Sequence, residues 1–175
     1  MKKILTALLA LTMVFALSVP AFADGGTIST AGGTSSVPVT LTTAGASFSV
    51  TVPTAFPVNV AANGTVTVAD NLKIVNNSKG QIKVTSVVLN GANSWSVVDY
   101  ATDFSKQKAD TKAFGFKLQG KNVAAGGVAD ISGFTAVDGN GGELPISYDA
   151  NIAVQSSAMT DATIASAVFT IGWNS

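Results

Sequence analysis

Residues 48–89, FSVTVPTAFPVNVAANGTVTVADNLKIVNNSKGQIKVTSVVL, decide the fold of this 175-residue chain. The apolar residues that alternate with their neighbours are Phe48, Val50, Val52, Phe56, Val58, Val60, Val66, Val68, Leu72, Ile74, Ile82 and Val84. A period of two places each run on one face of a β-strand. Pro, Asn-Gly and Lys-Gly separate the runs, as turn residues do between short strands. The stretch therefore predicts an antiparallel sheet with one buried face.

Two local features refine this prediction. Asn63-Gly64 lies between the runs that end at Val60 and begin at Val66. Both residues tolerate a positive φ, so the pair predicts a hairpin. Further on, the alternation breaks at 87–89, Val-Val-Leu. This break predicts either a β-bulge or a strand buried on both faces.

The rest of the chain continues the pattern of short strands. Further strands are expected within 95–100, 114–118, 144–154 and 168–173. The charged stretch 101–113 is expected to be an exposed loop without regular structure, and 159–165 has room for at most one short helical turn, with Thr160 as its cap. The sequence predicts an all-β fold, a two-sheet antiparallel β-sandwich (Ig-like or jelly-roll-like) of about 9–10 short strands.

The N-terminal residues predict export. Residues 1–23 contain two Lys, an apolar run to Val19 and an Ala-Phe-Ala cleavage site ending at Ala23, the three parts of a secretory signal. The apolar run is shorter than the roughly 20 residues of a spanning helix, so cleavage is favoured over a membrane anchor. A Gly/Ser/Thr-rich leader, 24–36, then precedes a single domain, 37–175. We expect a secreted, extracellular protein, either released or held non-covalently on the cell wall.

The composition excludes several functions. The chain has no His, Arg or Cys, and after the signal it carries eight Lys against ten acidic residues. Phosphate recognition relies on clusters of Lys and Arg, so nucleic acid and anionic membranes are not expected partners. Without His or Cys, neither a Ser-His-Asp nor a Cys-His site is possible. The Ser-Lys pairs lie in polar turns where Lys stays protonated. The sequence therefore predicts a protein that is not an enzyme.

A first candidate site is the strand predicted at 37–43. Val37, Val39 and Leu41 fall on one face of it, behind a flexible leader. Such a strand has two possible fates. It pairs within its own domain, or it completes the sheet of a neighbouring copy by strand addition.

A second candidate is a calcium site. Asp138, Asn140 and Glu143 place oxygen donors close together, and Asp149 lies at the twelfth position of a calcium loop that would begin at Asp138. Glu143, however, stands where that loop requires Gly, and a glycine-rich hairpin turn explains the same residues. Both interpretations remain open. Calcium is the one cofactor that the sequence suggests.

A third candidate is a surface for binding sugars. Trp95, Asp99, Tyr100 and Asp103 lie together at the start of the charged loop 101–113. An aromatic ring flanked by carboxylates is suited to a glycan or peptidoglycan, and paired carboxylates could also line a hydrolytic cleft. Against this, a Trp on an apolar strand face is more often packed in a core or an interface.

Some motifs resemble known families. The residues TVPTAFPV (51–58), KIVNNS (73–78), NSWSVVDYATDF (93–104) and VFTIGW (168–173) resemble small secreted β-sandwich proteins of anaerobic Gram-positive bacteria, a group without an assigned activity. Trp95-Ser96-Val97 is similar to the motif of WxL-type cell-wall-binding surface proteins, with Val97 in place of Leu. Camelysin-type matrix fibre subunits share the layout of signal, sandwich and free N-terminal segment. The resemblance implies a place at the cell surface.

Together these features predict a secreted, non-catalytic structural or adhesive protein of the cell surface or extracellular matrix. It would self-assemble through its N-terminal strand, with further copies of itself as partners. The alternative is a module that binds a cell-wall or host glycan through Trp95, Tyr100 and the loop 101–113.

Overall fold

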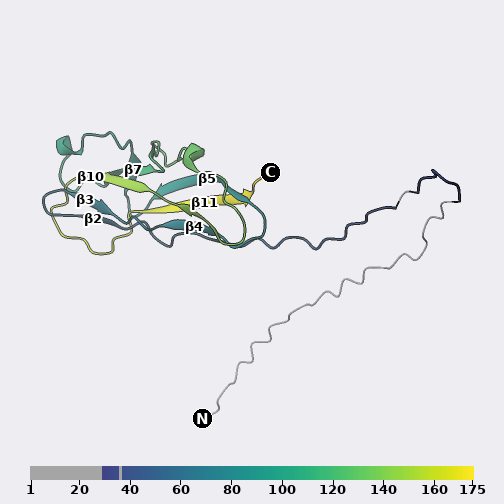
Figure 1. Ribbon diagram of the computed structural model, residues 1–175. Helices are drawn as coiled ribbons and strands as arrows, with labels where there is room; N and C mark the ends of the chain where they lie inside the picture. The colour runs from purple at the N-terminus through teal and green to yellow at the C-terminus, as the bar shows by residue number, and fades with distance from the viewer. Residues whose placement is uncertain (1–28, 36) are drawn as a thin grey trace, which may run out of the picture. The chain divides into compact units, whose positions relative to one another are not determined.

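The computed structural model describes residues 29–35 and 37–175 (Figure 1). The predicted signal, 1–23, and residues 24–28 and 36 of the predicted leader lie outside these residues. The chain divides into two units, Met1–Thr43 and Ala44–Ser175. In the described part of the chain, no helix has the length and apolar content needed to cross a membrane.

The unit Ala44–Ser175 is built from β-strands and two short 3-10 turns, and its described residues contain no α-helix. The elements are β1 (Val50–Thr51), β2 (Val58–Val60), β3 (Val66–Val68), β4 (Lys73–Asn76), β5 (Ile82–Gly91), β6 (Ser96–Val98), η1 (Phe104–Lys106), β7 (Ala113–Leu118), β8 (Lys121–Asn122), η2 (Ile131–Gly133), β9 (Gly142–Pro145), β10 (Tyr148–Ile152) and β11 (Ala165–Trp173). The predicted all-β class is confirmed.

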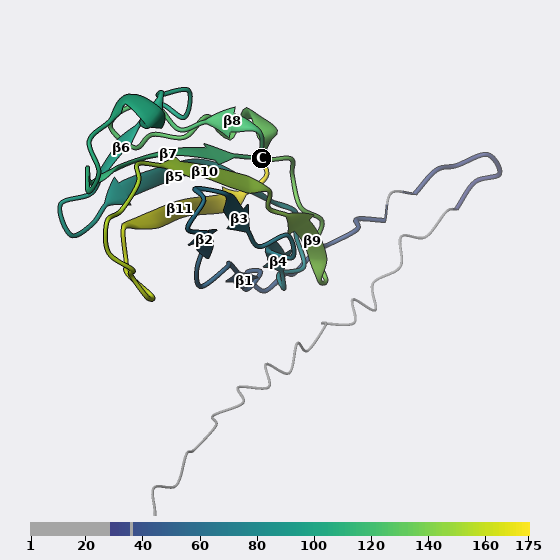
Figure 2. The same ribbon diagram turned by 90° about the vertical axis from the view of Figure 1, so that its left-hand side faces the viewer.

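These strands form several small sheets, which Figure 2 shows from the side. Their orders are β1-β4-β9, β10-β7-β6 with β8 added on β7, β11-β5, and β2-β3. The pairs are antiparallel, as predicted, with one exception: β6 pairs with β7 in parallel. The long charged loop between these two strands, 99–112, provides the crossover that a parallel pair requires.

The predicted hairpin at Asn63-Gly64 is confirmed, although its turn differs from the expected one. β2 pairs with β3, with Val60 opposite Val66. Gly64 has a φ of 83°, whereas Asn63 is not among the residues with positive φ. The Gly64 N–H donates to the Ala61 carbonyl at 2.8 Å, and Ala61 N–H donates to Thr65 at 2.9 Å. This is a three-residue loop that ends in a left-handed glycine, a common alternative to the two-residue turn.

The predicted irregularity in 85–89 is a β-bulge. In the β11–β5 ladder, Thr170 lies opposite Ser86 and Ile171 lies opposite Val84, so Thr85 is an extra residue on β5. The extra residue changes which positions of the strand, even-numbered or odd-numbered, point into the core. The buried side chains are accordingly at even positions before the bulge and at odd positions after it: Ile82, Val84, Val87 and Leu89.

The long strand predicted at 144–154 is instead two strands in different sheets. β9 pairs with β4, and β10 pairs with β7 (Figure 2). Between them, Ile146 N–H donates to the Leu72 carbonyl, and Ser147 N–H donates to Gln119 Oε1. The alternation continues unbroken through this crossing because both sheets bury the same side of the chain, so periodicity alone did not reveal it.

The helical turn expected at 159–165 is absent. Asp161, placed in its first turn, has a φ of 50°, which a right-handed helix does not allow. The 3-10 turns lie elsewhere, at η1 and η2, where Asp103 and Asp130 accept a hydrogen bond from the backbone N–H two residues on. The loop 101–113, expected to be irregular, therefore contains η1, and it buries Phe104.

Aromatic rings form the centre of the core. Phe56, in the segment before β2, packs edge-on against Phe116 of β7 and Tyr148 of β10, and it stacks with Phe169 of β11. Phe56 therefore joins side chains from two of the sheets. Apolar burial of this kind is the main stabilising term of the domain.

Candidate functional site

Tyr100 is the centre of a polar cluster that joins three strands. Its hydroxyl donates to Asp149 Oδ2 on β10, and Lys117 Nζ of β7 lies 4.2 Å from the centre of its ring. Its backbone N–H donates to Asn122 Oδ1 on β8 at 3.0 Å. Tyr100 is half-buried, so its ring and these polar groups reach the surface together. This is the part of the predicted sugar-binding group that could contact a ligand.

The other three predicted sugar-binding residues have structural roles. Trp95 is a core residue, 6% exposed, and its ring packs edge-on against Phe114. Asp99 Oδ1 accepts a hydrogen bond from Ala101 N–H at 2.7 Å and shapes the turn after β6. The Asp103 side chain caps the 3-10 turn η1 by accepting a hydrogen bond from Ser105 N–H. The Trp95 ring is therefore not available to stack on a sugar.

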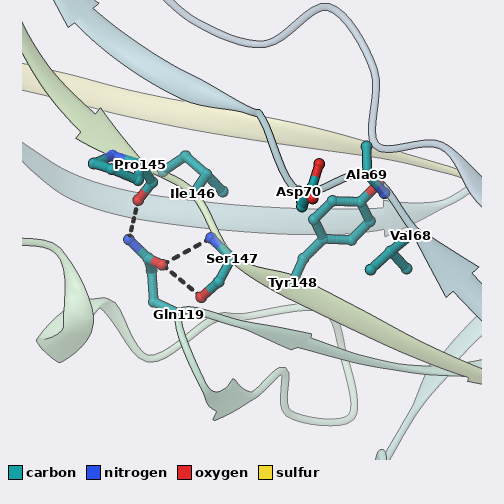
Figure 3. A pocket seen from close by; sticks show the side chains of 8 residues that line it. All are labelled: Val68, Ala69, Asp70, Gln119, Pro145, Ile146, Ser147 and Tyr148. Atoms are coloured by element: carbon teal, nitrogen blue, oxygen red, sulfur yellow. Dashed lines mark hydrogen bonds between the residues drawn. The ribbon is translucent and has the colours of Figure 1, made fainter.

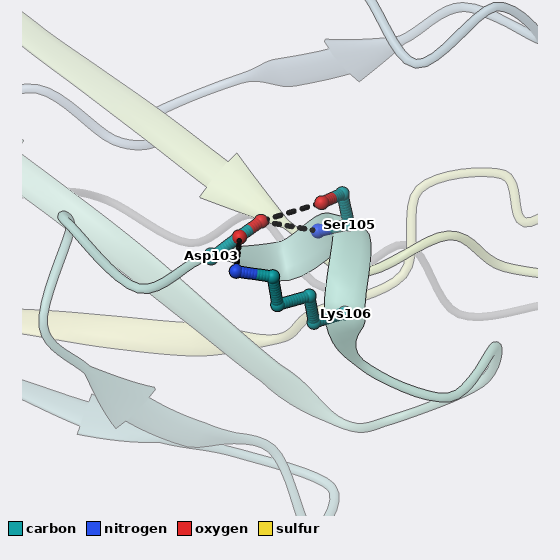
Figure 4. Close-up of polar contacts among 3 residues, drawn as sticks. All are labelled: Asp103, Ser105 and Lys106. Atoms are coloured by element: carbon teal, nitrogen blue, oxygen red, sulfur yellow. Dashed lines mark hydrogen bonds and ion pairs between the residues drawn. The ribbon is translucent and has the colours of Figure 1, made fainter.

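Figure 4 shows the contacts of Asp103. Its Oδ1 accepts hydrogen bonds from the Ser105 hydroxyl at 2.5 Å and from the Ser105 N–H at 3.2 Å, while its Oδ2 lies 2.9 Å from Lys106 Nζ. The Ser105 hydroxyl and then Lys106 favour the ionised carboxylate, so they lower the pKa of Asp103 below its ordinary value. These are the contacts of a turn cap, and they leave Asp103 fully engaged within its own turn.

Three of the four predicted calcium ligands use their carboxylates on other partners. Glu143 pairs with Lys73 at 2.6 Å, Asp138 Oδ1 accepts from Gln81 Nε2 at 2.8 Å, and Asp149 accepts from Tyr100. Asn140 has a φ of 59° in the turn before β9. Among the described residues, no group of three or more acidic side chains is placed to hold a metal ion.

The structure also has a pocket that the sequence did not indicate (Figure 3). Its volume is about 400 Å³, and it is lined by Val68, Ala69, Asp70, Gln119, Pro145, Ile146, Ser147 and Tyr148. The polar groups of the wall bond to one another: Gln119 Oε1 accepts from the Ser147 N–H and hydroxyl, and Gln119 Nε2 donates to the Pro145 carbonyl. Three distant segments form this wall, so no local pattern marks it. Its hydrogen bonds hold the crossing from β9 to β10 in place.

The two tyrosines of the chain give a testable pH dependence. The hydrogen bond to Asp149, followed by burial, raises the pKa of Tyr100 above 10.0, and burial raises the pKa of Tyr148. A raised native pKa adds stability that is complete below pH 10 and is lost as pH rises through the native value. We expect Tyr100→Phe to lose less stability than the native protein between about pH 8 and pH 11. Urea unfolding at the two pH values measures the difference, and equal losses would contradict it.

The residues of the predicted assembly strand form no strand. Among the described residues of the unit Met1–Thr43, residues 37–43 make no β-bridge, and Val37, Val39 and Leu41 are 80%, 98% and 84% exposed. Soluble proteins do expose single apolar residues, and here three of them alternate along a short uncharged segment.

Comparisons with protein-family models, curated proteins and solved structures found no match to this chain.

Proposed function

We propose that this protein is a secreted, non-catalytic structural or adhesive subunit of the cell surface or extracellular matrix, and that it self-assembles through residues 37–43. One observation carries the proposal: Val37, Val39 and Leu41 alternate on an uncharged segment that makes no β-bridge among the described residues of its own unit and leaves them largely exposed. An extended segment with this pattern is suited to adding a strand to a sheet. Its backbone then supplies affinity, and its alternating side chains supply specificity.

The domain that receives such a strand is proposed to be a two-layer β-sandwich, Ig-like or jelly-roll-like. The contacts of Phe56 support this arrangement, because its ring touches Phe116 and Tyr148 of one sheet and Phe169 of another. Phe134 also packs edge-on against Phe169. Side chains that meet between the inner faces of two sheets are what a sandwich core requires.

The assembly is tested by charges on one face of 37–43. In the double variant Val39→Asp/Leu41→Asp, each copy would have to bury two carboxylates in order to pair, which is strongly unfavourable. We expect this variant to lose assembly while it folds normally, because both side chains are exposed in the single chain. Negative-stain electron microscopy of the secreted protein would show fibres for the native chain and none for the variant.

The matched control is Thr40→Asp/Thr42→Asp, which adds the same charge to the opposite face of the same segment. This control should retain assembly, because its carboxylates would remain in water. If the two double variants assemble equally, the apolar face of 37–43 is not the contact, and the proposed mode of assembly fails.

A second candidate function, binding of a cell-wall or host glycan, is supported by the Tyr100 cluster. A half-buried ring beside Asp149, Lys117 and Asn122 offers both stacking and hydrogen bonds. Retention on peptidoglycan would test it, with Tyr100→Ala compared against Thr67→Ala on β3. Equal retention of the two variants would remove this candidate.

A further inference from the structure

β11 is a long strand with one unused edge. It pairs with β5 along nine residues, and no other described strand pairs with it. None of its residues is fully buried: Ala165, Ala167, Phe169 and Ile171, which face the core, are half-buried, Trp173 at the end of this face is 41% exposed, and Val168 on the outer face is 51% exposed. β5, in contrast, is bridged on its second side at Val88 and Ile82, by Val128 and Val137. β11 is therefore the open side of the β11–β5 pair.

Hydrogen bonds just beyond the two ends of β11 show which backbone groups face the open edge. Ala92 N–H donates to the Ile164 carbonyl, and Asn174 N–H donates to the Gln81 carbonyl, both at 2.9 Å. Successive residues of a strand point their polar groups to opposite sides, and the bulge adds its extra residue to β5. Even-numbered residues of β11 therefore face β5. The N–H and C=O groups of its odd-numbered residues face the open edge.

The open edge of β11 lacks the usual protection against pairing. Proteins protect edge strands with charges, with proline or by keeping them short. β11 has the sequence ASAVFTIGW, without charge or proline, over nine residues. The other outer strands are two to five residues long; among the longer ones, β9 contains Pro145 and β10 contains Asp149. The described part of the domain thus has one long unprotected edge.

Residues 37–43 fit this edge in both hydrogen bonding and side chains. Pro38 has no N–H, so it must point away from the acceptor strand, and Val37, Val39 and Leu41 then point their backbone groups toward it. In an antiparallel pair these odd-numbered residues lie opposite odd-numbered residues of β11, with side chains on the same face. That face of β11 carries the half-buried Phe169 and Ile171. Registers that place odd-numbered residues opposite each other therefore satisfy the backbone, and they place the three apolar side chains at the partly covered edge of the core.

We propose that β11 is the acceptor edge for residues 37–43 of a second copy, added as an antiparallel strand, an inference that rests on the proposed self-assembly. In this antiparallel arrangement the strand must come from a second copy, because of the reach of the chain. Phe48 packs against Trp173, and Ser49 bonds to Ser78, so the domain begins at the Trp173 end of β11. Antiparallel pairing puts Thr43 toward the Ala165 end, roughly 20 Å away. The five steps from Thr43 to Phe48 span at most about 18 Å, so the segment of the same copy falls short.

The pairing is tested by disulfide crosslinking. The chain contains no cysteine, so only the introduced cysteines can form a disulfide. Thr40→Cys lies on the outer face of the donor segment, and residues opposite each other on one face have Cβ atoms about 5 Å apart. This variant is mixed with a mass-tagged second variant and oxidised. The β11 variants are Ser166→Cys, Val168→Cys and Thr170→Cys. The control is Thr67→Cys, which is also exposed but lies on β3.

We expect Thr40→Cys to form a disulfide-linked mixed dimer with at least one of the β11 variants. No such dimer should form with the Thr67→Cys control. Electron microscopy of the same samples separates the two proposals. If fibres form but the mixed dimer appears equally with Thr67→Cys, or with none of the β11 variants, the acceptor is not β11 and the self-assembly stands. If the native chain forms no assembly, both proposals fall.

Discussion

Asn76→Ala is expected to lower the free energy of unfolding by about 3–5 kcal/mol, among the largest effects of any single substitution. Asn76 is completely buried. Its Nδ2 donates to the carbonyls of Gly80 at 2.8 Å and of Val137 and Asp138 at 3.0 Å, and its Oδ1 accepts from Ser78 N–H at 3.0 Å. Alanine would remove all four bonds. The Val137 carbonyl keeps its bond from Ile82 N–H, but the Ser78 N–H would be left buried without a partner. An unsatisfied buried group costs about 1–3 kcal/mol, and the cavity left by the amide adds to this loss.

The adjacent residue provides the control for this prediction. Asn77 is exposed, and its side chain donates to Thr51 Oγ1 at 3.1 Å. Asn77→Ala should change stability by less than about 1 kcal/mol. Guanidinium unfolding followed by tryptophan fluorescence measures both variants. Similar midpoints for Asn76→Ala and Asn77→Ala would show that the buried amide is not a main link between 76–80 and 137–138.

Gly127→Ala should destabilise the domain by about 3–5 kcal/mol, through strain and a backbone clash. Gly127 has a φ of 83°, which costs an L-residue about 1–2 kcal/mol. A Cβ at this position would also lie 1.8 Å from the Leu89 carbonyl oxygen. The segment would have to move away from β5, and the bond from Ala129 N–H to the Val87 carbonyl, 3.1 Å, would be lost with it.

Gly126→Ala separates the clash from the strain. Gly126 has a φ of 97°, but a Cβ there meets no other atom within 4 Å. This variant should lose only the strain term, about 1–2 kcal/mol. The difference between the two midpoints in guanidinium therefore measures the contact of 127 with β5. If Gly126→Ala is as destabilising as Gly127→Ala, close packing against Leu89 is not the cause.

Local patterns in the sequence predicted most of the strands. The hairpin at Asn63-Gly64 and the bulge near Val87 depend on neighbouring residues, and both are present. The crossing at Ile146 was not predictable. Apolar residues alternate with a period of two both when a chain stays in one sheet and when it passes to another sheet with the same side buried. No local pattern marks Asn76 as a buried residue. Its burial depends on carbonyls some sixty residues away, at Val137 and Asp138.

The candidate sites were harder to predict than the strands. By sequence Trp95 is compatible with a binding surface, although a core position is the commoner one, and its burial and its contact with Phe114 place it in the core. The calcium pattern is a spacing of oxygen donors, but Glu143 and Asp138 use theirs on Lys73 and Gln81. The alternation at 37–43 was recognised, yet the free edge of β11 was not. Whether a strand lies at the edge of a sheet depends on how all the strands pair, so the sequence of the strand alone does not predict it.

The most direct test of self-assembly is sedimentation velocity of the purified secreted protein over a wide range of concentrations. Strand addition between copies is governed by mass action, so the mean sedimentation coefficient should increase with concentration. Val39→Asp/Leu41→Asp should remain at the value of a single chain throughout. If the native protein also sediments as a single chain at the highest concentration, residues 37–43 do not join copies, and the proposed structural role is contradicted.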